Sequence, residues 1–357
     1  MAIPDDRPAG LLEPGTRISD VLIVDQLLGE GAFAEVYRVD HAFLGRLAMK
    51  VFKRVASLEE TKAMLEEARL LSTLGHPNIV RLFDAGTVRT ASGLRGWFTT
   101  EYVPGGTLSR LAMSHRPGVP TALAVAVVEQ VASGLAVAHD CSPPIVHRDI
   151  TPANILIGYD GTGVRARISD FGLARATDPV TLLASAQGTL VFLAPEVLRH
   201  RVYSCASDVW SVGVIAYLLL TNHRPYSEPG RREAPYSTAR FQGRLVPPSA
   251  FNGDVDPELD AVVCDALAVR PEERPATGGE LVARLRACGA PPGSGRAEAD
   301  EPSRRSRELV EQAIRLARRP GELGRAADLL EEAVVLSPSL SDGYLPRLTA
   351  WRRGVTL

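Results

Sequence analysis

Two short polar segments hold the residues whose types and spacing best suit chemistry. Asp149 and Asn154 lie in the run I-V-H-R-D-I-T-P-A-N-I-L, and Asp170 follows in R-I-S-D-F-G-L-A. A loop with the first spacing can present a carboxylate to a hydroxyl group while the amide oxygen binds a metal ion. Asp170, close to a glycine that lets the chain turn, can hold Mg²⁺ against phosphates, because hard divalent cations take oxygen ligands. Together the two segments predict a nucleotide site.

A glycine-rich segment, G-E-G-A-F-A-E-V, covers residues 29–36. It stands between two expected strands rather than between a strand and a helix, which separates it from the dinucleotide-binding fingerprint. Gly29 and Gly31 would let the backbone approach phosphate oxygens, although the third glycine position holds Ala34. The segment predicts a strand-turn-strand flap over a nucleotide, with a plain hairpin turn as the alternative.

Lys50 ends the strand segment A-M-K and can hold the α- and β-phosphates from that strand. The chain has three lysines against thirty-seven arginines. A lysine at this position therefore indicates a role for a compact ammonium group rather than for the planar guanidinium of arginine. Glu67, on the following amphipathic segment, can pair with Lys50. The alternatives are an ordinary surface lysine and a pairing role for the neighbouring Glu66.

The elements that must position these residues change in character along the chain. Alternating apolar residues predict a three-stranded antiparallel meander at the start, and two further strands follow an amphipathic helix. Long apolar helices dominate afterwards, so a small sheet-bearing lobe precedes a larger helical one. The expected elements are the meander over 21–51, a helix over 58–74, strands near 80–83 and 96–102, and helices over 121–140, 204–221 and 257–269.

Composition shifts divide the chain further. The first residues are rich in Pro, Gly and Asp, which favours a disordered leader. A stretch rich in Pro, Gly, Ser and charge is typical of a linker, and amphipathic helices follow it. The predicted parts are a leader at 1–20, a small lobe at 21–103, a large lobe at 104–287, a linker at 288–303 and a helical segment at 304–357.

The motifs together resemble the eukaryotic-like, bacterial-type serine/threonine protein kinase family. A-P-E at residues 194–196 and S-D-V-W-S-V-G at residues 207–213 add to the runs quoted above, and the resemblance extends from about Val21 to Ala287. It implies an α+β bilobal protein kinase fold with a small β-rich N-lobe and a larger α-helical C-lobe. It also implies transfer of the γ-phosphoryl group of ATP to protein hydroxyls, those of the chain itself included, with Mg²⁺ or in its place Mn²⁺.

The resemblance assigns roles to the residues singled out. Asp149 becomes the catalytic base, Asn154 and Asp170 the metal ligands, and Lys50 and Glu67 the ion pair of the active state. Residues 101–103 become the hinge that bonds the adenine. The residues that the resemblance places around the nucleotide are Leu28, Gly29, Gly31, Val36, Ala48, Lys50, the gatekeeper Thr100, Glu101, Val103 and Leu156.

Structural roles also follow from the resemblance. Glu196 is expected to pair with Arg274, and Asp208 is expected to brace the catalytic loop. A hydrophobic spine that joins the lobes is expected from Leu71, Leu82, His147 and Phe171.

Arg148, directly before Asp149, indicates control by a phosphorylated activation loop, because a guanidinium pairs with phosphate in a bidentate way. The loop is expected over residues 173–193. Thr181 and Ser185 are the favoured phosphosites, since Thr189 matches the family position that bonds to the catalytic aspartate. The alternative is that none of these hydroxyls is phosphorylated.

The departure from the family pattern is Thr151. Serine/threonine kinases place a lysine there, and its absence removes a cation beside the developing charge. We expect an active but slow enzyme, with an ATP-binding pseudokinase scaffold that acts through its helical tail as the alternative. Pro152 and the G-T before A-P-E favour serine/threonine over tyrosine specificity, and the A-P-E segment favours a protein over a small-molecule substrate.

Charge, cysteine content and hydropathy narrow the remaining classes of partner, metal site and cellular location. Forty basic and forty-two acidic residues give a net charge of -2. This balance leaves no excess positive charge to attract nucleic acid, so we expect no nucleic-acid partner. The four cysteines form no C-x-x-C pair, which argues against zinc and disulfides. The longest strongly apolar run, residues 209–220, is about half of the roughly twenty residues that a spanning helix needs, and no secretory signal is recognised at the start. We expect a cytoplasmic protein without a membrane span.

The helical segment has its own resemblance. Residues 325–338 are similar to the second helix of a tetratricopeptide repeat, with Ala326, Leu330, Ala333 and Pro338 at its spacing. About three repeats are needed for a continuous core, so this segment must dock on the kinase body, dock on a partner, or begin a longer array. A helical pair without a binding role is the alternative.

Overall fold

The computed structural model describes two compact units. One comprises the chain up to Gly75 together with Val80–Tyr102, and the other comprises His76–Ile79 and almost all of the chain from Val103 onwards. The observed architecture, a β-sheet unit and a helical unit, agrees with the predicted α+β organisation of a small β-rich part and a larger α-helical part. The structure describes residues 10–53, 72–115, 118–160, 163–171, 189–227, 241, 243–288, 304–319, 321–337, 340–352 and 354–355.

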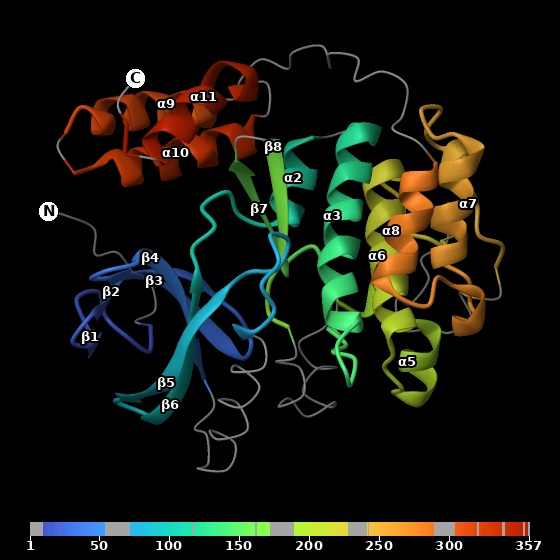
Figure 1. Cartoon of the computed structure of the whole chain (residues 1–357), viewed down its shortest axis with the longest axis horizontal. Coiled ribbons are helices and arrows are strands. Elements are labelled where there is room, and N and C mark those ends of the chain that lie inside the picture. The colour runs from blue at the N-terminus through green and yellow to red at the C-terminus, as the bar shows by residue number, and fades with distance from the viewer. Residues whose placement is uncertain are drawn as a thin grey trace, which may run out of the picture. The chain divides into compact units, whose positions relative to one another are not determined.

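The first unit is built on a six-stranded antiparallel sheet with the order β1-β2-β3-β4-β6-β5 (Figure 1). The predicted meander is confirmed as β2, β3 and β4. The last two strands are longer than predicted, because Gly86 and Gly93 interrupt the apolar alternation without interrupting the ladder. The strands are β1 (Arg17–Ser19), β2 (Leu22–Glu30), β3 (Ala34–His41), β4 (Gly45–Phe52), β5 (Leu82–Thr90) and β6 (Gly93–Glu101).

The expectation of a disordered leader over residues 1–20 is corrected for residues 10–20. Leu12 is 6% exposed and belongs to the core of the sheet with Tyr37 and Met49. Its backbone N–H donates to Tyr37 Oη at 2.9 Å, and the N–H of Leu11 donates to Glu35 Oε2 at 2.7 Å. Two buried polar side chains of β3 therefore fix a segment whose composition alone indicates disorder.

The second unit is helical around α3. This helix packs against α6, α8 and the strand β8. The predicted helices over 121–140, 204–221 and 257–269 are confirmed as α3, α6 and α7, whereas the helix over 58–74 lies outside the described residues except at its end. The helices are α2 (Leu108–Ser114), α3 (Thr121–His139), α5 (Pro195–His200), α6 (Cys205–Thr221), α7 (Pro257–Ala266) and α8 (Gly278–Ala287).

Local sequence explains where these helices begin and end. Ser204 caps α6 in a reciprocal box with Ser207, which satisfies two otherwise unpaired N–H groups. Asp256 caps α7 by accepting from the N–H of Leu259 at 2.7 Å. Helix α7 ends at Ala266, before the predicted 269, and Pro271 begins the next turn.

Helix α3 is apolar along its whole length. Within the described part of the chain it is the one helix whose length and composition would suffice to cross a membrane, and half of that stretch is buried inside the protein. Gly134 lets α3 approach the segment just before β5 closely, since a Cβ there would lie 2.9 Å from Asn78 O. The contacts are those of a core helix.

A two-stranded hairpin of β7 (Ile155–Asp160) and β8 (Gly163–Ile168) crosses the second unit. Asn78 Nδ2 donates to Ala166 O at 2.8 Å, and Gln130 of α3 donates to Val164 O at 3.0 Å. The hairpin is thereby attached to the core helix, and the predicted metal ligands stand at one of its ends.

Three further helices follow the predicted linker: α9 (Arg304–Ala317), α10 (Leu323–Leu336) and α11 (Ser341–Arg352). Ala326, Leu330 and Ala333 are fully buried in α10, and Ser306 and Ser337 share a buried hydroxyl bond of 2.8 Å. These helices are part of the second compact unit. Their identity as a tetratricopeptide repeat stays a prediction.

Candidate active site

Asp208 braces the loop that holds Asp149, the predicted catalytic base, as the resemblance implies. Its carboxylate, 1% exposed, accepts hydrogen bonds from the backbone N–H of His147 at 2.7 Å and of Arg148 at 2.9 Å. His139 Nδ1 accepts from the N–H of Gly278, so its Nε2 carries the proton and donates to Asp208 at 3.1 Å. Three donors thus satisfy a carboxylate that would be costly to bury alone.

The brace holds the loop in an uncommon backbone conformation. Arg148 in this loop has a φ of +73°, in the left-handed region that L-residues seldom adopt. Asp170, which follows β8 outside this loop, has a φ of +63°. Arg148 lies over the ring of Tyr203 at 5.7 Å, and its buried Nε has no hydrogen-bond partner among the described residues. Burial, together with the charge of Asp149, raises the pKa of the Tyr203 hydroxyl, which therefore stays neutral beside the loop.

Asn154 fixes Asp149 directly. Its amide Nδ2 donates at 2.8 Å both to the backbone oxygen and to Oδ2 of Asp149, and its N–H donates to Thr151 O at 3.0 Å. The loop therefore closes on itself, with the carboxylate of Asp149 held in one orientation. The atom of Asn154 that can serve as a metal ligand is then Oδ1.

The hairpin brings the second metal-ligand candidate to the same end. Ile155 pairs with Ile168, and Ser169 donates to Asn154 O from its N–H at 2.8 Å and from its hydroxyl at 3.0 Å. Asn154 and Asp170 therefore leave the hairpin at one end. Their oxygens, with the carboxylate of Asp149, are hard donors that fit Mg²⁺ or Mn²⁺. Within the described ranges no cluster of three His, Cys, Asp or Glu residues suggests a different metal.

The expected contact between His147 and Phe171 is confirmed. Their rings meet edge to face with centroids 4.6 Å apart, and His147 Nε2 bonds to Ser169 O at 2.9 Å. Of the other two residues assigned to the hydrophobic spine, Leu82 begins β5 in the sheet unit and Leu71 lies outside the described residues.

In the sheet unit, the predicted nucleotide residues share one face. Val36 pairs with Lys50, and Ala48, two residues before Lys50, pairs with Thr100. Because alternate residues of a strand point to the same side, all four lie on the face opposite Met49, which is buried in the core. The structure thus brings these four predicted residues together, while Glu67 lies outside the described residues.

The glycine-rich turn joins β2 to β3. Gly29 pairs with Val36, and the N–H of Gly31 donates to Ala34 O at 2.8 Å. A Cβ at Gly29 would meet nothing within 4 Å, and one at Gly31 would meet only Ala34 O at 3.5 Å. Neither packing nor a positive φ demands these glycines. Leu28 beside them is 40% exposed.

The predicted hinge, residues 101–103, begins at Glu101, the last residue of β6. Thr100 Oγ1 donates to Glu101 O at 3.3 Å, and Glu101 is fixed to Arg81, whose N–H donates to Oε1 at 3.0 Å and whose carbonyl accepts from the N–H of Glu101 at 2.9 Å. Val103, 9% exposed, lies in the helical unit. Leu156 follows in β7, where it bridges to Thr107.

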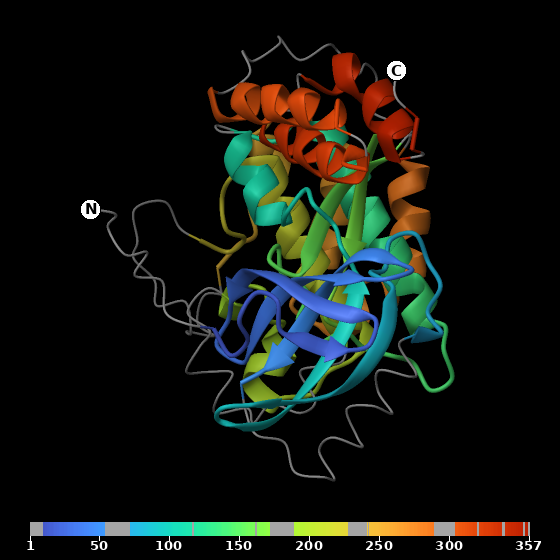
Figure 2. The ribbon, with the colours of Figure 1, turned by 90° about the vertical axis from the view of Figure 1, so that its left-hand side faces the viewer.

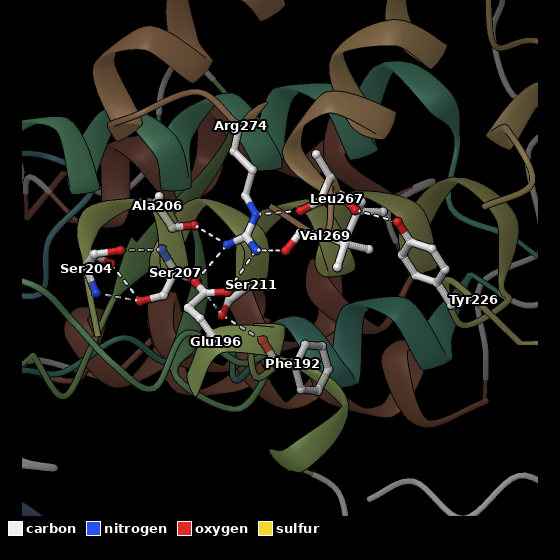
Figure 3. Close-up of polar contacts among 11 residues, drawn as sticks. Phe192, Glu196, Ser204, Ala206, Ser207, Ser211, Tyr226, Leu267, Val269 and Arg274 are labelled. Carbon is white, nitrogen blue, oxygen red and sulfur yellow. Dashed lines mark hydrogen bonds and ion pairs between the residues drawn. The ribbon is translucent and has the colours of Figure 1, made fainter. Parts of the chain in front are cut away.

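Figure 3 shows the predicted ion pair between Glu196 and Arg274, which is confirmed. Both nitrogens of the guanidinium fork donate to the carboxylate, at 2.9 and 2.8 Å. Arg274, whose side chain is 0% exposed, also donates to Ala206 O and Ala268 O and lies 4.8 Å over the ring of Trp210. The pair ties the A-P-E segment to the helices behind it.

The regulatory positions are only partly described. Thr181 and Ser185 lie outside the described residues. Thr189 begins a short 3-10 turn, Thr189–Val191, but its side chain is not among those described, so its predicted bond to Asp149 stays a prediction. Sequence reasoning missed Tyr203, whose position beside Arg148 and Asp149 has no local sequence signal.

Comparison with known proteins agrees with this geometry. The protein kinase domain family matches residues 22–283. Serine/threonine-protein kinase PknB of Mycolicibacterium smegmatis is 33% identical over 275 residues, which are 75% of this chain and 43% of that protein. Serine/threonine-protein kinase PknL of Mycobacterium tuberculosis is 34% identical over 277 residues, 74% of this chain and 66% of that protein.

A solved structure shows the same fold. The crystal structure of the Mycobacterium tuberculosis PknI kinase domain superimposes with a TM-score of 0.57 at 25% identity, covering 77% of this chain and 99% of that one. The chain spans less than half the length of PknB. The match to the kinase family covers most of the chain, and the chain belongs to the protein kinase domain family.

Proposed function

We propose that the chain is a serine/threonine protein kinase that transfers the γ-phosphoryl group of ATP to protein hydroxyls, including those of its own activation loop. The observation that carries this proposal is the double hydrogen bond from Asn154 to Asp149 at the end of the hairpin from which Asp170 also leaves. A held base beside two hard oxygen ligands is what phosphoryl transfer requires.

In this proposal Asp149 orients the substrate hydroxyl and accepts its proton. Asn154 Oδ1 and the carboxylate of Asp170 hold the divalent cation, which neutralises phosphate charge when bound. Since Nδ2 of Asn154 already bonds Asp149, a single side chain couples the position of the base to the metal site. A shift of either group would disturb the other.

The sheet unit supplies most of the phosphate and adenine contacts in this proposal, and Val103 and Leu156 belong to the helical unit. Lys50 neutralises the α- and β-phosphates, and Glu67 orients Lys50. The lack of any packing reason for Gly29 and Gly31 supports a role in admitting phosphate oxygens. The remaining contacts are assigned to Leu28, Val36, Ala48, Thr100, Glu101, Val103 and Leu156.

Arg148 supports the regulatory part of the proposal. Its buried Nε lacks a partner among the described residues, so the guanidinium keeps a donor for an anion. Phosphorylated Thr181 or Ser185 would supply that anion. We further infer a cytosolic enzyme whose protein substrates include the chain itself, without a nucleic-acid partner or a membrane span, and with the predicted domain boundaries.

Incorporation of labelled phosphate from ATP and Mg²⁺ into the chain and into a generic protein substrate tests the proposal. Asp149→Asn and Lys50→Met should each lower the rate about a hundredfold or more, as expected for loss of a base or of a phosphate-binding cation. Asp140→Asn is the matched control, because Asp140 is exposed at the end of α3. Equal incorporation in all four proteins would reject the proposal.

A second function, an ATP-binding pseudokinase scaffold, is favoured by one observation, the threonine at position 151. It predicts that nucleotide raises the melting temperature of the chain while no phosphate is transferred. Robust turnover that depends on Asp149 would eliminate it.

A further inference from the structure

The C-terminal helices contact the rest of the helical unit through α10 and α11. Helix α10 contacts α2 and β7, and α11 contacts β7 (Figures 1 and 2). The match to the kinase family ends at residue 283, so these helices are an addition to the kinase fold. The strand they cover begins directly after Asn154 and carries Leu156.

One buried carboxylate makes the central contact. Glu331 of α10 is 4% exposed. Its Oε1 accepts a hydrogen bond of 2.7 Å from the backbone N–H of Tyr159 in β7, and its Oε2 accepts one of 2.6 Å from Arg352 of α11. Arg352 also donates to Asp328 at 2.6 Å. Helix α10 therefore supplies the acceptor for a backbone N–H of β7, a strand that belongs to the kinase fold.

Gly158 allows this approach. A Cβ on Gly158 would lie 2.8 Å from Glu331 Oε1, 2.8 Å from an Arg167 guanidinium nitrogen and 3.3 Å from Val103 Cγ1. At this one position the tail, the strand β8 and the last hinge residue meet. Glycine suits this position because a Cβ would crowd the ends of the Glu331 and Arg167 side chains.

The buried position of Glu331 is costly for a charged carboxylate. Burial raises the pKa of this carboxyl, while Arg352, the N–H of Tyr159 and Arg167 act in the opposite direction. A buried carboxylate is tolerated only where such partners surround it. By contrast, the bridge between Arg110 of α2 and Glu332 is partly exposed, at 3.1 Å, and contributes little. Of these two polar contacts between α10 and the kinase fold, the one made by Glu331 is the buried one.

We propose that Glu331 is a positioning residue for nucleotide binding. It acts through β7 and Val103, which the proposed kinase function places against the nucleotide, so the inference rests on that function. The tail is then a built-in support of the nucleotide site. Its docked face is covered by the kinase itself and is not a surface kept open for a partner protein.

Nucleotide affinity of the full chain is the decisive measurement. The dissociation constant of a non-hydrolysable ATP analogue with Mg²⁺, measured by calorimetry well below the melting temperature, should rise about fivefold in Glu331→Gln, within the range usual for coupled sites. Glu311→Gln is the matched control, because Glu311 lies exposed on α9 and, among the described residues, pairs with Arg315 of the same helix. An unchanged affinity in folded Glu331→Gln would reduce the contact to a purely structural one and overturn the inference.

Two further measurements keep the test decisive if Glu331→Gln does not fold. Arg352→Ala removes the partner of Glu331 in α11. The Arg352 side chain is 37% exposed, and its loss should also weaken binding of the analogue. In the wild type, the bound analogue should slow hydrogen exchange at the Tyr159 amide and in α10, because coupling between two sites is reciprocal. Unchanged exchange together with unchanged affinity of Arg352→Ala would refute the proposal.

These readouts do not depend on phosphoryl transfer. If the analogue binding is coupled to Glu331 but no phosphate is transferred, the inference stands and the kinase function fails. If phosphate is transferred normally and the coupling is absent, the kinase function stands and the inference fails.

Discussion

Thr151 stands where serine/threonine kinases place a lysine. It is 6% exposed, and its backbone oxygen accepts from the N–H of Asn154. Thr151→Lys should raise kcat about tenfold, because a cation would then stabilise the charge that develops on the transferring phosphoryl group. Thr151→Met is the control, since it adds similar length without charge. Steady-state kinetics with saturating ATP measures both, and equal rates in the two variants would contradict the argument.

Cys264 gives a prediction about pH. Burial, with help from the charges of Asp260 and Asp265, raises the pKa of its thiol from 9.0 to about 11. The alkylation rate of Cys264 in the folded chain should therefore rise with pH around a midpoint near 11, against about 8.5–9 in urea. The midpoint is the readout, because limited access alters the rate but not its pH profile. A midpoint near 9 in the folded chain would refute the burial argument.

The sign of the linked stability change follows from the same shift. Below pH 9 the thiol is protonated in both states and its contribution to stability is complete. Between pH 9 and 11 the unfolded chain ionises first, so the free energy of unfolding falls as the pH rises. Cys264→Ser should remove that part of the fall.

Single residues are predictable from sequence where they stand in short runs. Asp149, Asn154 and Asp170 could be found because local spacing places them at a loop and at the ends of one hairpin. The contact between Glu331 and Tyr159 could not, because 172 residues separate the partners and neither side carries a motif. The same holds for Tyr203, which takes its meaning from burial beside Asp149.

Among the elements, the packing of α8 on α3 gives a sharp test. A Cβ on Gly278, the first residue of α8, would lie 2.6 Å from Ala132 O and 2.8 Å from the backbone nitrogen of Ala136. Gly278→Ala should therefore lower the free energy of unfolding by about 2 kcal/mol, because backbone cannot move aside as a flexible side chain can. Urea unfolding measures the change.

The matched control for Gly278 is Gly324→Ala in the first turn of α10. A Cβ on Gly324 would meet nothing within 4 Å, so this substitution should be neutral or stabilising by a few tenths of a kcal/mol, up to about 1 kcal/mol. Equal losses in the two variants would show that contact with α3 is not the cause.

Elements were predictable in proportion to the strength of their periodicity. Helix α6 has an apolar run with a serine cap, and its bounds agree with the prediction to one residue. Strands β5 and β6 have weaker alternation, and the prediction captured only part of each. Residues 10–20 fall in the predicted disordered leader, because the first twenty residues are rich in Pro, Gly and Asp. The groups that fix them, Glu35 and Tyr37, lie in another element.

At the scale of the whole molecule, the sequence left open whether the C-terminal helices dock on the kinase, on a partner or on further repeats. The structure shows docking on the kinase, in the same compact unit. Amphipathic periodicity identifies the apolar stripe of a helix but not the surface that covers it. The docking face is recognisable only once Tyr159, 7% exposed, is seen beneath α10 and α11.

Removal of these helices should therefore destabilise the kinase itself. A chain that ends at Cys288 uncovers Tyr159 and leaves its N–H without the carboxylate acceptor. We expect its melting temperature to fall by about 5–10 °C, which corresponds to a loss of a few kcal/mol in a chain of this size. Differential scanning calorimetry measures the change, with a chain that lacks only residues 1–9 as the control for shortening. If the two shortened chains melt together at the wild-type temperature, the docked helices contribute nothing to the stability of the kinase, and their contact with β7 is incidental.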